Sequence, residues 1–489
     1  MDDITQINVL DLGKMIKTRK VSLEEVVSKQ LEAIQSKERD CNSYITIMED
    51  EAYAQAKRVQ KRIDNGELVF SPLAGVPVAI KDDICTNGIK TTAASRSLSN
   101  YVPTYNASVI EKLIEAGAII IGKTNMDELA IGNSTETSYY GPTKNPCNLE
   151  HVPGGSSGGS ASAVAAGQAF YSLASDTGGS IRQAASYCGL VGIKPTYGTV
   201  SRYGLIPSAS SLEQIGVMAR SVADCAAALY IISGYDPKDS TSLNKDDYNY
   251  SEGLVGDLKN MKIGIPKIYL GEGLDKDVRT NFNNVVDTFR DMGALVEEFD
   301  LPNLQYSVAA YYVIASAEFS SNIARVDGVR YGYRAKDYKN LEDLYVDTRS
   351  EAFGTDVKKR ILYGNLVLSA DNYQAYFVKA QKVRSIIIES FTEAFDKYDI
   401  IMGPTCPNTA PLLNASQENS LQKDLLDIYS VPVNLAGLPT ISIPSGNDKK
   451  ALPIGLQLIG RPFGERDIIR AAHCFEEHYK SKRKEQINE

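Results

Sequence analysis

The sequence contains PGGSSGGS at residues 153–160 and DTGGSIR at residues 176–182. Glycine lets the backbone approach other groups closely, and serine supplies a hydroxyl that can donate, accept or attack. The segment between the two stretches, ASAVAAGQAFYSLAS, is small and apolar, which favours a buried helix and strand. Two serine loops joined by a buried unit predict an active site. The alternative is a pair of flexible Gly/Ser linkers.

Composition limits the class of protein. The chain has 489 residues and a net charge of −9, which argues against a broad nucleic-acid-binding surface. No apolar run reaches the ~18 residues of a membrane helix, and the acidic N-terminus does not resemble a signal peptide. The seven cysteines are scattered, with no C-x-x-C pair. We therefore expect a cytoplasmic enzyme without a metal site and without membrane contact.

Apolar periodicity alternates between strand and helix along most of the chain. Strands are expected at 43–48, 73–80, 118–122, 262–270, 294–302, 399–407, 438–446 and 452–460, and helices at 22–35, 49–66, 107–117, 220–234 and 275–293. From about Leu301 to Tyr398 the pattern is helical. The alternation predicts an α/β fold, in which a large sheet is covered by helices on both faces.

Ser180 lies at the predicted start of a helix, directly after Thr177, Gly178 and Gly179. Consecutive amides at such a turn can converge on one point and hold the oxyanion of a tetrahedral intermediate. A serine hydroxyl becomes a good nucleophile only when a base accepts its proton. Because the chain has only three histidines, a lysine is the better candidate for this base.

Lys81 fits that role because it ends an apolar strand. Burial there disfavours the ammonium form and lowers the pKa of the lysine. Ser156, in the first serine loop, can carry the proton from Ser180 to Lys81. The neighbouring Asp82 and Asp83 oppose a lowered pKa, so the direction of each side chain decides the outcome. Taken alone, a lysine at a strand end is more often a surface residue.

Other interpretations of the serine loops fit the residues less well. A phosphate-binding loop needs a closing lysine, which GGSSGGS lacks. The dinucleotide-binding fingerprint and the nucleophile elbow are not matched either. Cys147 and His151 suggest a thiol nucleophile, but the flanking Pro146 and Pro153 favour a plain loop.

Lys81, the GGSSGGS run and DTGGSIR together resemble the amidase signature family. The resemblance implies a large mixed sheet and a Ser–cis-Ser–Lys triad. Ser180 would be the nucleophile, Ser156 the bridging serine preceded by a cis peptide bond, and Lys81 the base. The oxyanion donors that the resemblance implies are Thr177, Gly178, Gly179 and Ser180.

Within this family, the chain is most similar to the glutamine-hydrolysing members of tRNA-dependent amidotransferases. The stretches that carry this similarity are residues 73–92, 119–136, 191–216, 311–332 and 431–444. The resemblance implies that Arg360 binds the α-carboxylate of glutamine and Asp427 its α-ammonium, with Tyr311 at a further substrate-side position. Without the family, the charge run around Arg360 would indicate a solvated helix face.

The resemblance also implies partners. Ammonia would pass to a B subunit that uses ATP and magnesium on misacylated tRNA, while a small C subunit wraps this chain. The chain itself would hold no cofactor. The alternatives are a stand-alone amidase for small aryl or aliphatic amides, which would not need Arg360 and Asp427, and a catalytically silent scaffold. The intact Lys81, Ser156 and Ser180 argue against the scaffold.

We expect one amidase domain over residues 1–489. Its portions are N-terminal helices (1–65), the core with the triad (66–240), an inserted α/β and helical portion (241–420), and C-terminal strands and a helix (421–489). The sequence departs from the family pattern at Asp83, Cys147 and Ala184, where asparagine, tryptophan and proline are usual.

Overall fold

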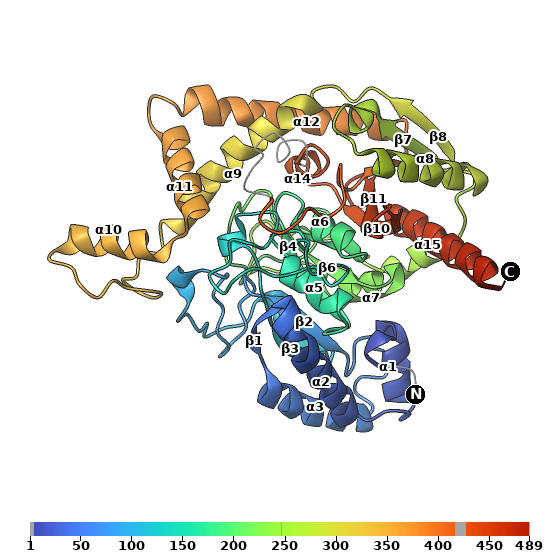
Figure 1. The fold of residues 1–489 in the computed structure, drawn as a ribbon, viewed down its shortest axis with the longest axis horizontal. Helices are drawn as coiled ribbons and strands as arrows, with labels where there is room; N and C mark the ends of the chain where they lie inside the picture. Colours follow the sequence, from blue (N-terminus) through green and yellow to red (C-terminus); the bar gives the residue numbers. More distant parts are fainter. Residues whose placement is uncertain (1–3, 246, 416–426, 489) are drawn as a thin grey trace.

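The computed structural model of the chain describes residues 4–245, 247–415 and 427–488. The strands are β1 (Tyr44–Ile47), β2 (Pro77–Lys81), β3 (Ile119–Thr124), β4 (Tyr171–Asp176), β5 (Val191–Lys194), β6 (Gln214–Ala219), β7 (Lys262–Pro266), β8 (Leu295–Phe299), β9 (Ile400–Pro404), β10 (Thr440–Asn447) and β11 (Pro453–Gly460). In the described part of the chain they form one 11-stranded sheet in the order β1-β3-β2-β4-β6-β5-β10-β11-β9-β7-β8 (Figure 1).

The sheet is mixed. Strand β2 pairs in parallel with β3 and β4, and β7 pairs in parallel with β8 and β9. The pairs in the middle of the sheet, from β4 to β9, are antiparallel. This arrangement confirms the predicted α/β fold with a large mixed sheet. The sheet draws on strands from residue 44 to residue 460, and the four portions of 1–489 stay a prediction.

The helices are α1 (Val9–Lys17), α2 (Leu23–Cys41), α3 (Glu49–Asp64), α4 (Ser108–Glu115), α5 (Gly158–Ala165), α6 (Ser180–Tyr187), α7 (Val222–Ile232), α8 (Lys276–Asp291), α9 (Ser307–Ile323), α10 (Leu341–Ala352), α11 (Thr355–Leu368), α12 (Lys379–Phe395), α14 (Val431–Leu435) and α15 (Glu465–Asn488). Figure 1 shows α2 and α3 at one end of the molecule, and α8 with β7 and β8 at the other. Helices α9 to α12 form the predicted helical portion, from which α10 projects (Figure 1).

Both faces of the sheet are buried, as β9 illustrates. Ile400 and Met402 pack in one apolar cluster, whereas Ile401, between them, packs in another. Successive side chains of a strand point to opposite faces, so the two clusters lie on opposite sides of the sheet. Such double burial explains why these strands read as continuous apolar runs in the sequence.

Local signals account for several element boundaries. Ser22 is the N-cap of α2, since its Oγ accepts a hydrogen bond from the backbone N–H of Glu25 at 3.1 Å. The strand expected at 73–80 begins only at Pro77. The residues before it form a turn, in which the N–H of Val76 donates to the carbonyl of Leu73 at 3.0 Å.

Two central strands, β5 and β6, are missing from the sequence prediction. Strand β5 has only four residues and lies among the glycines and prolines of 189–207, whose turn signals hide it. Strand β6 is completely buried, and its short apolar run is interrupted by Gly216. The register of both strands depends on pairing with β4 and β10, which a local pattern cannot reveal.

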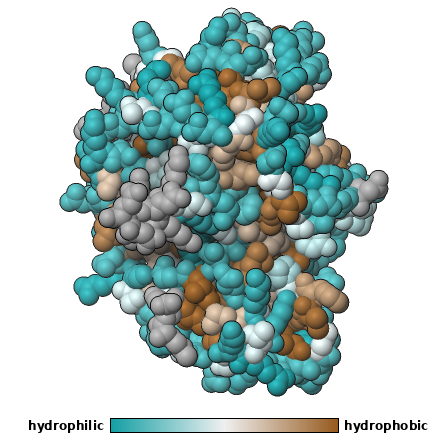
Figure 2. All heavy atoms as spheres, turned by 90° about the vertical axis from the view of Figure 1, so that its right-hand side faces the viewer, coloured by the Kyte–Doolittle hydropathy of each residue, from teal (hydrophilic) through white to brown (hydrophobic). Residues whose placement is uncertain are grey.

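The face drawn in Figure 2 is largely hydrophilic, with hydrophobic atoms in separate groups. In the described part of the chain, every helix is too short or not apolar enough to cross a bilayer.

Removing core volume from the sheet should destabilise the protein. Ile441 on β10 is 0% exposed, so Ile441→Ala should lower the free energy of unfolding by about 2–5 kcal/mol. Phe70 is 96% exposed, and Phe70→Ala should change it by less than about 0.5 kcal/mol. Urea unfolding followed by circular dichroism measures both. Equal effects of the two substitutions would contradict this account of the core.

Candidate active site

The structure brings the predicted triad residues together. Lys81 ends β2, Ser180 begins α6, and Ser156 lies between them in the first serine loop. Lys81 Nζ lies 2.9 Å from Ser156 Oγ, which lies 3.1 Å from Ser180 Oγ. The Gly155–Ser156 peptide bond is cis. The three side chains therefore form one continuous hydrogen-bonded chain, along which a proton can move.

Lys81 is buried, and the two aspartates that follow it point in different directions. Asp82 turns to Lys123, with 3.3 Å between its Oδ1 and Lys123 Nζ. Asp83 turns to Lys81, with 3.5 Å between its Oδ2 and Lys81 Nζ. Burial lowers the pKa of Lys81 from its ordinary value, and Asp83 opposes that shift without cancelling it. The net direction favours an amine that can accept a proton.

The turn before Ser180 carries the predicted oxyanion donors. The backbone N–H groups of Thr177, Gly178 and Ser180 make no backbone hydrogen bond among the described residues. The structure differs from the prediction for Gly179, because its N–H donates to Asp176 Oδ1 at 2.9 Å. Gly179 has φ 125°, which a side chain would disfavour. Gly179 therefore shapes the turn and does not supply a free N–H donor.

A buried ion pair that sequence reasoning missed holds this turn. Arg182 donates to both oxygens of Asp176, at 3.1 Å and 3.0 Å, and to Gln457 Oε1 at 2.8 Å. Burial alone would raise the pKa of Asp176, but the Arg182 guanidinium outweighs it and holds the pKa below its usual value. The only sequence signal was the position of both residues inside DTGGSIR. Their contact fixes the end of β4 to the start of α6.

Ser180 opens into a cavity of ≈ 240 Å³. This is smaller than the ~300–1,000 Å³ typical of sites for drug-sized ligands and suits a molecule such as an amino acid. The residues lining it include Thr177, Gly178, Gly179, Ser180, Tyr311, Tyr312, Arg360, Asp427 and Ser430. All three residues predicted on the substrate side thus share a cavity with Ser180.

Tyr312 links the two charged residues of this cavity, and sequence reasoning missed it. Its hydroxyl donates to Asp427 Oδ2 at 2.7 Å, and the Arg360 guanidinium lies over its ring at 4.8 Å from the centroid. Arg360 also donates to Ser316 Oγ at 3.3 Å. Arg360 is half-buried in the cavity wall, so the solvated helix face does not describe it.

Tyr311 faces the oxyanion turn. A side chain at Gly178 would collide with the Tyr311 hydroxyl, so the turn and the ring fit together only because residue 178 is glycine. Burial raises the pKa of Tyr311, which keeps the phenol protonated. Tyr311 therefore brings a neutral hydrogen-bond donor to the cavity that Ser180 also lines.

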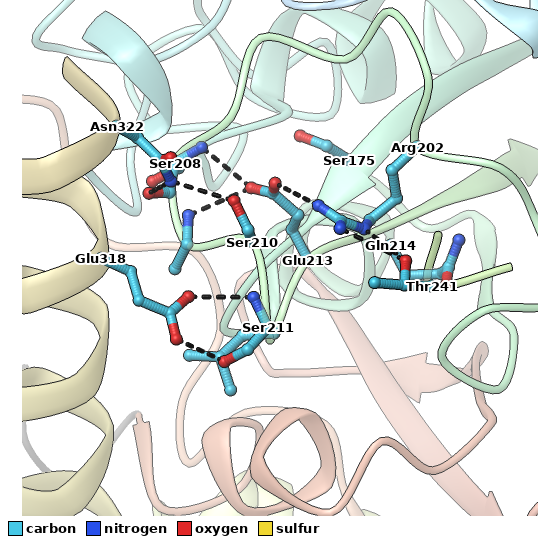
Figure 3. Close-up of polar contacts among 12 residues, drawn as sticks. Ser175, Arg202, Ser208, Ser210, Ser211, Glu213, Gln214, Thr241, Glu318 and Asn322 are labelled. Carbon is cyan, nitrogen blue, oxygen red and sulfur yellow. Dashed lines mark hydrogen bonds and ion pairs between the residues drawn. The ribbon is translucent and has the colours of Figure 1, made fainter. Parts of the chain in front are cut away.

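One wall of the cavity is held by acidic side chains (Figure 3). Ser208 lines the cavity, and its N–H donates to Glu213 at 2.9 Å. Glu213 pairs with Arg202 at 3.2 Å. Glu318, on α9, accepts from both the N–H and the hydroxyl of Ser211, at 2.9 Å and 2.6 Å. The turn that carries Ser208 is thereby fixed from two sides.

The residues of the thiol alternative lie outside the cavity. Cys147 and His151 are not among its lining residues. His151 Nδ1 lies 2.6 Å from the carbonyl oxygen of Ala410. The Cys147 thiol donates weakly to the carbonyl of Cys188 at 3.6 Å. In the described part of the chain no histidine lines the cavity, and Lys81, connected to Ser180 through Ser156, stays the predicted base.

Comparison with known proteins assigns the chain to a family. The family model described as Amidase matches residues 25–469, so the chain belongs to the amidase family.

Three similar proteins of that family carry the same name. The chain is 55% identical over 482 residues to the A subunit of the glutamyl-tRNA(Gln) amidotransferase of Lachnoclostridium phytofermentans, covering 97% of this chain and 98% of that one. The protein of the same name from Agathobacter rectalis is also 55% identical, over 481 residues, with 98% and 95% coverage. The crystal structure of the Thermotoga maritima protein of that name superposes with a TM-score of 0.80 at 38% identity, covering 97% of this chain and 95% of that one.

Breaking the Asp176–Arg182 pair should be costly. Both side chains are 0% exposed, so Arg182→Met should lower the free energy of unfolding by about 3–5 kcal/mol. The loss should be smaller at about pH 4 than at pH 7, because the orphaned carboxyl can then take up a proton. Lys267→Ala, which breaks an exposed pair with Asp300, should cost at most about 1 kcal/mol. Urea unfolding at both pH values measures this, and a loss independent of pH would contradict it.

Proposed function

We propose that this chain is the glutamine-hydrolysing subunit of a tRNA-dependent amidotransferase. The observation that carries the proposal is the hydrogen-bonded chain from Lys81 through Ser156 to Ser180, which opens into a cavity lined by Arg360 and Asp427. The names of the relatives, at 55% identity over nearly the whole chain, support the same function.

The reaction begins with a neutral Lys81. As Ser180 Oγ attacks the side-chain amide carbon of glutamine, its proton passes to Ser156 Oγ while the proton of Ser156 passes to Lys81 Nζ. The oxyanion accepts hydrogen bonds from backbone N–H groups of the turn before Ser180, where each donor lowers the barrier by about 2.7–4 kcal/mol. The proton returns along the relay to the departing nitrogen, and ammonia leaves. Water then hydrolyses the glutamyl ester by the same route.

Arg360 and Asp427 suit the other end of glutamine. A planar guanidinium binds a carboxylate with two parallel hydrogen bonds, and an aspartate pairs with an ammonium. Tyr312 joins both residues, which fixes their separation. A neutral aryl or aliphatic amide has no charged groups for these partners. The charged pair therefore favours an amino-acid substrate over the stand-alone amidase.

The proposed complex supplies what this chain does not carry. We propose a B subunit that uses ATP and magnesium to convert Glu-tRNA(Gln) or Asp-tRNA(Asn) with the released ammonia, which would reach it through a channel. A small C subunit would complete the heterotrimer, and misacylated tRNA would contact mainly the B subunit. The proposed location is the cytoplasm, the chain has no proposed cofactor of its own, and its net charge of −9 agrees with limited tRNA contact.

Removing the nucleophile tests the enzyme against a silent scaffold. Ser180→Ala should lower glutamine turnover on the order of 10⁴–10⁶-fold and abolish labelling by a serine-directed sulfonyl fluoride. Ser162→Ala should keep both, because the contacts of Ser162 Oγ among the described residues, with Ser43, Lys144 and Cys41, all lie outside the relay. Ammonia release and intact-protein mass spectrometry give the two readouts. Labelling that persists in Ser180→Ala would refute the proposed nucleophile.

Removing the guanidinium distinguishes the glutamine-hydrolysing subunit from the stand-alone amidase. Arg360→Ala should lower kcat/KM for glutamine about 30-fold or more, because the α-carboxylate loses a charge-assisted partner. Arg360→Lys should lose less, since it keeps the charge but not the fork. Hydrolysis of a neutral aliphatic amide should be unchanged in both variants. Unchanged glutamine turnover, with good cleavage of the neutral amide, would favour the stand-alone amidase.

A further inference from the structure

The hydrogen-bonded chain does not end at Lys81. Lys81 Nζ also lies 2.7 Å from the hydroxyl of Ser175, on the neighbouring strand β4. That hydroxyl donates to Asp83 Oδ2 at 2.6 Å. Asp83 Oδ2 also lies 3.5 Å from Lys81 Nζ. Lys81, Ser175 and Asp83 thus form a closed, buried triangle of contacts.

The number of protons available determines what this triangle does. A serine hydroxyl has one proton to donate, and that of Ser175 goes to the Asp83 carboxylate. Ser175 Oγ can then only accept from Lys81. A neutral amine has two N–H bonds and one lone pair, and Ser175 provides two acceptors, Oγ at 2.7 Å and its carbonyl at 3.4 Å. The lone pair of Lys81 is left for the hydroxyl proton of Ser156.

We propose that Asp83, acting through Ser175, is a positioning residue that aims the Lys81 lone pair at Ser156 and stabilises the ammonium formed when the proton arrives. The inference rests on the proposed function only in that Lys81 is the base for Ser180. It extends the hydrogen-bonded chain from three residues to five, while the proton relay stays at three. Asp83 and Ser175 exchange no proton during the reaction, so both keep the same charge throughout it.

Among the charged groups around Lys81, Asp83 has the largest effect on the pKa of its amine. Burial lowers the pKa of Lys81, and Asp83 is the largest opposing influence, ahead of two more distant carboxylates. Asp83 Oδ1 has no hydrogen-bond partner among the described residues, so its charge is compensated mainly on the side of Lys81 and Ser175. The other titratable groups that face Lys81 or Asp83 are Asp127, Asp176, Glu213 and Cys85.

Glu213→Gln is the control variant for Asp83→Asn. Burial raises the pKa of Glu213 to about 7, so it also titrates near neutral pH. It has no contact with Lys81 in the described structure, where it binds Arg202 and the amides of Ser208 and Ala209. Glu213→Gln therefore removes a nearby acid of the same kind without touching the triangle.

The test is the pH dependence of Ser180 reactivity. We would measure the rate of sulfonylation by a sulfonyl fluoride across the pH range, and kcat/KM for glutamine beside it, in wild type, Asp83→Asn, Ser175→Ala and Glu213→Gln. In wild type, the rate rises with pH as Lys81 loses its proton. Asp83→Asn removes the negative charge, so the ammonium is less stable and the rising limb should move to lower pH by about 1–3 units. Its plateau should fall, because a less basic amine is a weaker acceptor.

Each outcome supports or overturns the inference. Ser175→Ala should lower the plateau of the pH profile about tenfold or more. In glutamine hydrolysis this loss should appear in kcat, with KM for glutamine little changed. Glu213→Gln should move the limb less than Asp83→Asn does. The inference is overturned if Asp83→Asn leaves the rising limb of the pH profile at its wild-type position. It is also overturned if Glu213→Gln moves that limb as far as Asp83→Asn does. If Asp83→Asn does not fold, an unchanged plateau in Ser175→Ala overturns it alone. If the wild type is sulfonylated but does not hydrolyse glutamine, that result counts against the proposed function. The inference about Asp83 is then decided by the pH at which the sulfonylation rate rises in each variant.

Discussion

The burial of one lysine amine is the constraint on which this site depends. Lys81 is 0% exposed, and an ammonium so placed is costly unless it is paired or gives up its proton. Both routes exist here. Asp83 and Ser175 hold the charged form, and Ser156 provides the link to Ser180 when the amine is neutral. A base for serine chemistry needs access to both forms, and a lysine on the surface would stay charged at neutral pH.

Strand order explains how residues far apart in the chain reach this amine. Strands β2 and β4 are parallel neighbours, so Lys81 and Ser175 meet at the same end of the sheet. The loop after β4 then carries Ser180, while the loop before α5 carries Ser156. The Asp176–Arg182 pair fixes the turn between β4 and α6. The Ser180 hydroxyl is therefore held in place relative to the sheet. The chemistry is thus built on central strands, and the substrate side on helices.

Much of this arrangement could be predicted from the sequence. The directions in which neighbouring side chains point could not. The α/β fold followed from periodicity, and the triad from GGSSGGS and DTGGSIR with Lys81; the structure brings those side chains into contact, and their roles stay a prediction. Strands β5 and β6 were missed because partners on both sides stabilise them. Asp82 and Asp83 are chemically identical, yet one pairs with Lys123 and the other faces Lys81, because successive positions leaving a strand face opposite sides.

In the proposed function, the residues that recognise the substrate and the residues that react lie in different parts of the fold. Tyr311 and Tyr312 lie on α9 and Arg360 on α11, whereas Lys81 and Ser180 belong to the sheet and α6. Changes on α9 and α11 can therefore alter which amide is held without disturbing the relay. The two parts meet where Tyr311 fits against Gly178, so that a ring from the helical portion contacts the oxyanion turn. In the proposed reaction, a substrate held by the helices would lie against a turn whose shape the sheet has already set.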